Sequence, residues 1–145
     1  MAPDEYVALW KDAASEIREA APEARIYVGG LFKRADWIRP ILDRLDPVPD
    51  GIDLHYPDDE DALRSAAELG LPLSVMEWNY VGRRVTAKDV AGWIEVLERW
   101  CADWGWYCWK DGSYMGLVGP SDRPRKSWRD LRDALRLLGP RRLQA

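Results

Sequence analysis

Apolar positions along the chain follow two alternating spacings, one typical of helices and one typical of short buried strands. Helical spacing, caps and breakers predict helices over Asp4–Ala21, Ala35–Leu45, Asp58–Leu69, Thr86–Trp104 and Lys126–Leu138. Short apolar runs between them predict strands over Arg25–Val28, Gly51–Tyr56, Leu71–Glu77 and Gly105–Trp109. Because helices and strands alternate, we expect an α/β fold in which right-handed helical crossovers join parallel strands.

Local signals sharpen several of these boundaries. Thr86 stands three residues before Asp89, which is the spacing of a capping box, so the fourth helix should begin there. The pair Gly29-Gly30 is expected to end the first strand, and Pro40 should make the second helix irregular. The chain is short enough for one compact domain, so residues 1–145 are expected to form a single one.

Composition narrows the classes of function. Of the 145 residues, 47% are hydrophobic and 32% charged, and the net charge is -4. This mildly acidic balance argues against a nucleic-acid partner, which needs a basic stripe to neutralise phosphates. No run of about 18 apolar residues occurs, so no membrane span is expected. The first residues carry no leader pattern, which predicts a cytoplasmic protein as the chain stands, although a longer parent could be secreted.

No cofactor and no metal site are expected. No glycine-rich nucleotide-binding motif follows any of the predicted strands. Cys101 and Cys108 form neither a metal-ligand pattern nor a disulfide framework. Tryptophan is the unusual residue, with 9 in the chain, several of them between Trp93 and Trp109. Core packing explains most such residues, stacking on a sugar ring is the other common use, and composition leaves both open.

Candidate chemistry lies at the carboxyl ends of the expected strands, where parallel α/β folds gather functional groups. These ends carry His55-Tyr56, Glu77-Trp78-Asn79 and Trp109-Lys110-Asp111. Glu77 directly follows the apolar run LSVM, so its carboxylate lies beside buried surface. The only histidine, His55, could hydrogen-bond to Glu77 or have a structural role. A charged Asp53 inside the fold would need a partner, and His55 and Arg25 are the candidates.

Several segments together resemble the second half of the (β/α)8 barrel of clan A retaining glycoside hydrolases. LPLSVMEWN resembles the seventh strand of these enzymes, which ends in the nucleophilic Glu, and GIDLHYP is similar to their sixth. WYCWKDG, followed by YMGLVGPSDRPRKSWRDL, resembles the eighth strand with its sugar-stacking Trp and the last helix. YVALWKDAASEIREAAPEARIYVGG resembles the fourth helix and fifth strand, so the likeness covers nearly the whole chain in the family's order.

This resemblance implies a fold and a set of roles. The fold would be half of a TIM barrel, with the family's fifth to eighth strands and outer helices, beginning at the helix after the fourth strand. Glu77 would attack the anomeric carbon and form a glycosyl-enzyme intermediate. His55 and Tyr56 would orient Glu77 or bind substrate, Trp109 would stack on the sugar, and Trp78 and Asn79 would lie at the rim of the site.

One part of the family's pattern is missing. The acid/base Glu of the family follows an Asn, and no Asn-Glu pair occurs in this chain. Asp58, Asp59 and Asp111 are nearby acids without that context. The half-domain is therefore expected to be incomplete alone and to associate with an N-terminal half-barrel or a second copy. Two alternatives remain open: a non-catalytic carbohydrate-binding or structural remnant, and an unrelated small α/β domain whose Glu77 pairs with a neighbouring base.

Overall fold

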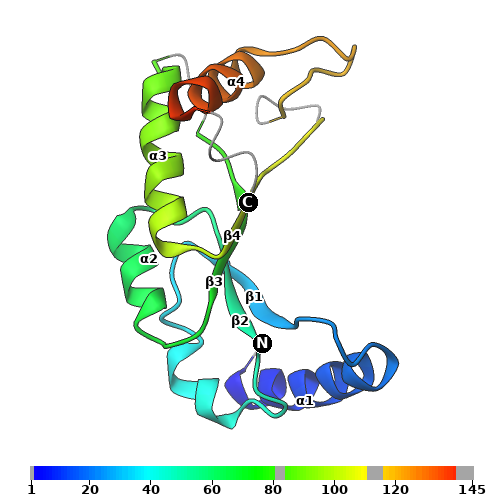
Figure 1. Cartoon of the computed structure of the whole chain (residues 1–145). Helices are drawn as coiled ribbons and strands as arrows, with labels where there is room; N and C mark the ends of the chain where they lie inside the picture. Colours follow the sequence, from blue (N-terminus) through cyan, green and yellow to red (C-terminus); the bar gives the residue numbers. More distant parts are fainter. Residues whose placement is uncertain (1, 81–83, 111–115, 140–145) are drawn as a thin grey trace. The chain divides into compact units, whose positions relative to one another are not determined.

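A computed structural model of the chain describes residues 2–80, 84–110 and 116–139. It has an α/β fold with one four-stranded parallel sheet (Figure 1). Its elements are α1 (Pro3–Ala20), β1 (Tyr27–Phe32), η1 (Arg39–Arg44), β2 (Gly51–His55), α2 (Glu60–Ala67), β3 (Leu73–Trp78), α3 (Ala87–Trp100), β4 (Asp103–Trp106) and α4 (Lys126–Leu138). The strand order is β1-β2-β3-β4, so consecutive strands are neighbours. The parallel α/β sheet predicted from the sequence is confirmed.

The chain divides into two compact units, Met1–Ser74 and Val75–Ala145. The boundary lies inside β3, after its second residue. Each unit has its own set of buried apolar side chains. That the whole chain behaves as a single domain stays a prediction. Of the helices in the described residues, none is both long and apolar enough to cross a membrane.

In the first unit, β1 pairs with β2, and α1 contacts η1. Ile52 and Leu54 of β2 are fully buried, and α1 buries Trp10, whose indole Nε1 donates to the carbonyl of Pro47 at 2.7 Å. The end of α1 is fixed through Asp50, whose carboxylate pairs with Arg18 and accepts the backbone N–H of Ile26 at 2.7 Å. The hydrogen bond from Ile26 is the main cause that lowers the pKa of Asp50, and Arg18 adds to it.

The first strand differs from its predicted range. It was expected to end before Gly29-Gly30, but β1 runs through both glycines to Phe32. Val28 pairs with Ile52 and Leu31 with Leu54, so β1 holds one more residue than β2 over this stretch. One type of bulge places a glycine with left-handed backbone at this point, and Gly30 has such a backbone at φ 71°. Gly29 and Gly30, which were expected to end the strand, therefore form a bulge inside β1.

The second predicted helix is shorter and of another kind. The range Ala35–Leu45 was expected to be helical, but only η1 forms, as a 3-10 helix. Pro40 sits in its first turn, where a missing N–H costs nothing. The next helix, α2, begins after Asp59, whose side chain accepts the backbone N–H of Ala62 at 2.9 Å.

The second unit is built around the packing of α3 against α4. The predicted capping box is confirmed, because Thr86 Oγ1 accepts from the N–H of Asp89 and the Asp89 carboxylate accepts from the N–H of Thr86. The predicted end of the helix at Trp104 was wrong. The backbone turns extended at Cys101, and β4 begins at Asp103. The spacing of Trp100 and Trp104 is helical, but the second of these belongs to a strand.

Candidate functional site

The predicted site residues fall into two groups. His55 and Tyr56 belong to the first unit, where His55 is the last residue of β2 and Tyr56 follows it. Glu77, Trp78, Asn79 and Trp109 belong to the second unit, at and after the ends of β3 and β4. Each group lies at the carboxyl ends of parallel strands, as the sequence predicts. That the two groups meet in one cleft stays a prediction.

In the first unit, His55 is tied to Asp53, two residues earlier on β2. The His55 Nε2 lies 2.9 Å from Asp53 Oδ2, and Ser74 Oγ donates to Asp53 Oδ1 at 3.1 Å. The Asp53 side chain is 15% exposed and that of His55 23% exposed. The expectation that Asp53 needs a partner is confirmed, and of the two candidates the structure gives His55. Gly29 makes room for this group, because a Cβ there would lie 2.6 Å from Asp53 Cβ.

The residues that follow β1 and β2 have unusual backbone conformations. Lys33 has φ 71° and Tyr56 has φ 50°, both in the left-handed region that side chains other than glycine rarely adopt. The N–H of Lys33 donates to the carbonyl of His55 at 2.7 Å, and its ammonium pairs with Asp58 at 2.8 Å. Such conformations cluster at functional sites. These two positions therefore support this edge of the sheet as a site.

The other acids near this edge are engaged in structure. Asp59 caps α2 and pairs with Arg34 at 3.4 Å, while Asp58 holds Lys33. Asp111, the third acid considered as a proton donor, lies outside the described residues.

The first unit also contains a tyrosine with a shifted pKa. Burial raises the pKa of Tyr6, and a backbone hydrogen bond from Gly29 opposes that rise.

In the second unit, Glu77 is half-buried at the penultimate position of β3. The strand end is joined to β4, because Tyr107 N–H donates to the carbonyl of Trp78 at 2.8 Å and Asn79 Nδ2 donates to the carbonyl of Tyr107 at 2.8 Å. Asn79 therefore fixes the backbone where the two strands end. The backbone that directly follows Glu77 is thereby joined to the end of β4.

Trp78 is a core residue in this structure. It is 1% exposed, and its ring contacts those of Trp104 and Trp106 at centroid distances of 5.7 and 5.0 Å. The indole N–H groups of Trp78 and Trp106 are buried and find no acceptor among the described residues. A part for Trp78 in substrate binding stays a prediction, and its buried ring offers no open face for stacking.

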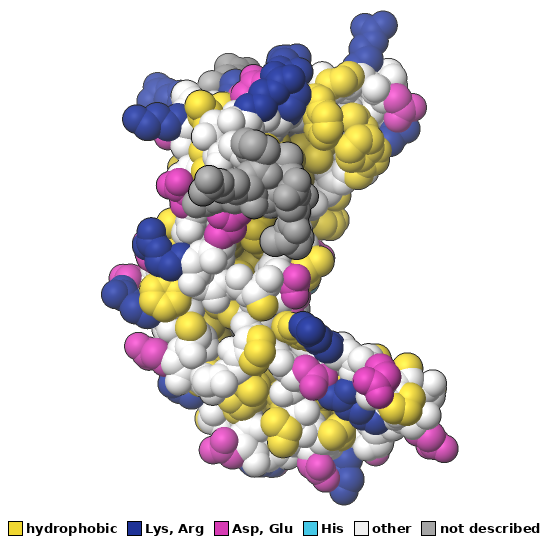
Figure 2. All heavy atoms as spheres, viewed as in Figure 1, with side chains coloured by type: hydrophobic (Ala, Val, Ile, Leu, Met, Phe, Trp, Pro, Cys, Tyr) yellow, Lys and Arg dark blue, Asp and Glu magenta, His cyan; other side chains and the backbone are white. Residues whose placement is uncertain are grey.

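Trp109 is the most exposed of the predicted aromatic residues, at 61%. The carbonyl of Trp109 accepts the N–H of Val118 at 2.9 Å. Its ring packs in a T-shaped arrangement with the ring of Trp128, the third residue of α4, and the two ring centroids are 5.8 Å apart. Figure 2 shows hydrophobic side chains gathered where the segment between β4 and α4 lies. An exposed indole that also packs against a second ring is suited to stacking on a flat apolar surface such as a sugar ring.

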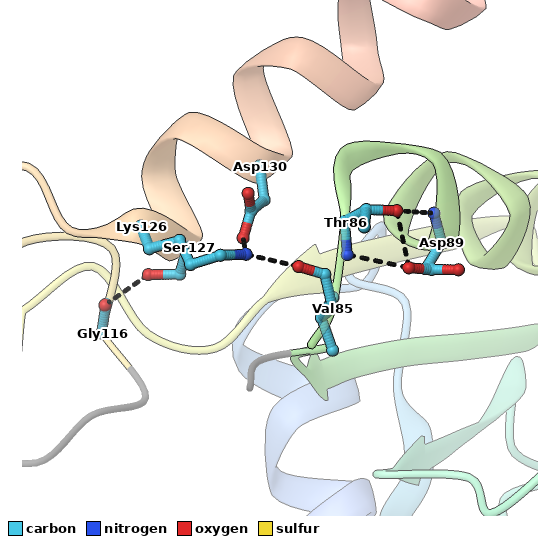
Figure 3. Close-up of polar contacts among 7 residues, drawn as sticks. All are labelled: Val85, Thr86, Asp89, Gly116, Lys126, Ser127 and Asp130. Carbon is cyan, nitrogen blue, oxygen red and sulfur yellow. Dashed lines mark hydrogen bonds and ion pairs between the residues drawn. The ribbon is translucent and has the colours of Figure 1, made fainter. Parts of the chain in front are cut away.

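Polar contacts fix the start of α4 (Figure 3). Ser127 Oγ donates to the carbonyl of Gly116 at 3.0 Å, and Lys126 bonds both the carbonyl of Val85 and the carboxylate of Asp130. Lys126 thereby links α4 to the residue that precedes the N-cap of α3. These bonds hold the helix turn that supports the Trp109 ring.

Sequence reasoning missed two residues of this arrangement. Ser74 is a hydroxyl residue within the apolar strand LPLSVM, and a buried hydroxyl needs an acceptor, so Asp53 on the neighbouring strand could have been inferred. Trp128 was not singled out, because nothing near it in sequence points to Trp109. Among the described residues, no three potential metal ligands come together. Comparison with known proteins found no family model and no curated protein that matches the chain.

Proposed function

We propose that this chain is the C-terminal half of a (β/α)8 barrel of the clan A retaining glycoside hydrolases, with Glu77 as its nucleophile. The observation that carries the proposal is the sheet order β1-β2-β3-β4 together with the place of Glu77 at the carboxyl end of β3. Doubly wound sheets reverse their strand order at a switch point, whereas barrel strands follow one another without reversal. The ends of barrel strands are also where catalytic residues lie.

The aromatic residues of the second unit support a carbohydrate as the ligand. Trp109 is exposed and braced by Trp128, and Tyr107 is also exposed at the end of β4. In the proposed reaction an oxygen of the Glu77 carboxylate attacks the anomeric carbon while the bond to the leaving oxygen breaks. The resulting glycosyl ester is then cleaved by water, which restores the carboxylate. Trp109 would hold the sugar by its apolar face.

The missing Asn-Glu pair predicts a specific defect. Without an acid, leaving groups that need a proton should depart slowly, and without a base, water should attack the intermediate slowly. Dinitrophenolate leaves without a proton, and azide attacks without a base. We therefore expect the chain to act on dinitrophenyl glycosides, to act poorly on phenyl glycosides, and to be accelerated by azide with formation of a glycosyl azide of retained configuration.

The experiment compares the wild-type chain with Glu77→Gln and with Glu95→Gln, a matched change at an exposed glutamate of α3. Turnover of dinitrophenyl glycosides should be lost in Glu77→Gln and kept in Glu95→Gln. Equal turnover in both variants would show that Glu77 is not the nucleophile. No turnover in any of the three, with sugar binding that depends on Trp109, would favour the second candidate, a non-catalytic carbohydrate-binding remnant.

The proposal also includes a partner. β1 and β4 are the edge strands of the sheet, and the edges of a parallel sheet present unpaired backbone groups. An N-terminal half-barrel, or a second copy of this chain, would pair with them. Only the N-terminal half would bring the acid/base carboxylate, because a second copy brings another Glu77. Light scattering after size-exclusion chromatography should show association, and a monomer at all concentrations would contradict this part of the proposal.

A further inference from the structure

Trp37 is an exposed aromatic residue that the proposed reaction does not use. It is 39% exposed, whereas Ala35 and Ile38, on either side of it in the same turn, are buried. The turn is closed by backbone hydrogen bonds from Ile38 and Arg39 to the carbonyl of Ala35, at 3.1 and 3.3 Å. Because the residues that anchor this turn belong to the core, the exposure of the indole follows from the fold of the turn.

A second ring, on α1, supports the indole of Trp37. The rings of Tyr6 and Trp37 are nearly perpendicular, at 86°, and their centroids are 4.9 Å apart. Tyr6 is itself anchored to the sheet, because its hydroxyl accepts a backbone hydrogen bond from Gly29 in the bulge of β1. A tyrosine hydroxyl that accepts one bond still has its own proton to donate. The indole therefore packs against a fixed ring that carries a hydrogen-bond donor.

The same arrangement occurs around Trp109 in the second unit. There the rings of Trp109 and Trp128 are also nearly perpendicular, at 81°. In both pairs the exposed tryptophan follows a strand, and the supporting ring belongs to one of the first four residues of a helix. Core packing accounts for the buried part of such an indole and not for the part that faces water. Since Trp109 is the residue proposed to hold a sugar, the repeated pair indicates a second place with the same use.

We propose that Trp37 forms the floor of a second carbohydrate-binding site, which lies in the first unit and holds a sugar unit other than the one at Trp109. The apolar face of a pyranose stacks on the indole, and the Tyr6 hydroxyl donates to one of the sugar hydroxyl groups. The carboxylate of Asp36, the exposed residue before Trp37, accepts from another. Two sites for sugar units suit an oligosaccharide or a polysaccharide. The inference rests on the proposed function for the class of ligand, and it uses no part of the chemistry of Glu77.

The test is made in a Trp109→Ala background, which removes the indole already proposed to hold a sugar. An array of plant, microbial and animal oligosaccharides identifies the glycan that this variant binds best, and titration calorimetry measures the affinity. Adding Trp37→Leu, which keeps an apolar side chain but removes the ring, should lower that affinity about tenfold. Adding Trp37→Phe, which keeps a flat ring, should lower it about threefold or less. Val48→Ala, at an exposed apolar residue before β2, is the control and should leave the affinity unchanged.

Three results would overturn the second site. One is a Trp109→Ala chain that binds no glycan of the array. Another is an affinity in Trp37→Leu that equals that of the Val48→Ala control. The third is an equal loss in Trp37→Leu and Trp37→Phe, because stacking depends on a flat ring.

Two further variants test the polar groups of the site. Tyr6→Phe keeps the supporting ring and removes its hydroxyl, and Asp36→Ala removes the exposed carboxylate. Each should lower the affinity about threefold to tenfold, which corresponds to the loss of one hydrogen bond. Unchanged affinity in both variants would show that these groups do not bind the sugar.

Failure of this inference and failure of the proposed function can be told apart. Turnover of dinitrophenyl glycosides that persists in Glu77→Gln would sink the proposed nucleophile, while the binding results at Trp37 would still stand. Full glycan affinity in Trp37→Leu would sink the second site, whatever the result for Glu77.

Discussion

The carboxyl ends of the strands differ sharply between the two units. In the first unit, β2 ends in His55, whose ring is bound by Asp53, and Asp53 in turn accepts a hydrogen bond from Ser74 near the start of β3. In the second unit, β3 and β4 end among indole rings, two of which have buried N–H groups with no acceptor in the described part of the chain. Buried indole N–H groups usually find an acceptor, so two that find none among the described residues set this cluster apart from the hydrogen-bonded group of the first unit. The first region is thus organised by hydrogen bonds and the second by packing.

The largest expected effect is in the aromatic region. Trp78→Ala should lower the free energy of unfolding by about 3–5 kcal/mol, because a fully buried indole is removed from between Trp104 and Trp106. Urea unfolding followed by circular dichroism measures this loss. The matched control is Trp109→Ala, which removes an exposed ring and should change stability by less than about 1 kcal/mol. Equal losses in the two variants would mean that burial does not distinguish these tryptophans.

A smaller effect is expected in the polar region. Ser74→Ala removes a buried donor to Asp53 and should lower the free energy of unfolding by about 1–2 kcal/mol. Ser121→Ala, at an exposed position of the second unit, provides the control and should be neutral. Should Ser74→Ala prove as stable as the wild type, the hydrogen bond to Asp53 would not organise this strand end.

The smallest effect depends on pH. The pKa of Asp50 is lowered by its bonds to Ile26 and Arg18, so the folded state favours the carboxylate. Its contribution to stability is then fully present above the ordinary pKa of about 3.9 and is lost as pH falls through the lower folded value. Asp50→Asn should cost about 1 kcal/mol at neutral pH, since the group is partly exposed and screened by solvent.

That difference should begin to shrink as the pH falls below about 4, and it should vanish below the lowered folded pKa, where the carboxyl is protonated in both the folded and the unfolded state. Unfolding curves of both proteins at a series of pH values measure it. A difference that stays constant down to pH 2, or that grows as the pH falls, would mean that the ionised carboxylate of Asp50 does not stabilise the fold.

Much of the fold follows from signals that are local in sequence. The capping box at Thr86 was predictable from the spacing of Thr86 and Asp89, and the strand Gly51–His55 and the helix Lys126–Leu138 were predictable from their own apolar patterns. The bulge at Gly29-Gly30 was not, because the same glycines would serve a turn equally well. The start of β4 was also missed, because tryptophans fit a helix and a strand, and only packing against Trp78 decides between them.

The candidate site was predictable to a smaller extent. That Glu77, His55 and Tyr56 end their strands follows from the apolar runs before them. The burial of Trp78 does not, since it depends on two rings that lie on another strand. The hydrogen bond from Ser74 to Asp53 and the ring contact between Trp128 and Trp109 likewise join residues that are distant in sequence. Contacts of this kind are fixed by the register of the strands and the packing of α4.

The central claim is that the Glu77 carboxylate is the nucleophile. It is tested most directly by trapping the glycosyl ester that Glu77 would form with the sugar. A 2-deoxy-2-fluoroglycosyl fluoride transfers its sugar without an acid, and the fluorine at carbon 2 slows hydrolysis of the ester that forms. Intact-mass measurement of the chain, treated in turn with reagents of several sugar configurations, should show one added fluoroglycosyl group with at least one of them. Peptide mapping should place the group on Glu77, and Glu77→Gln should remain unlabelled. Labelling at another carboxylate, or equal labelling of Glu77→Gln, would contradict the account.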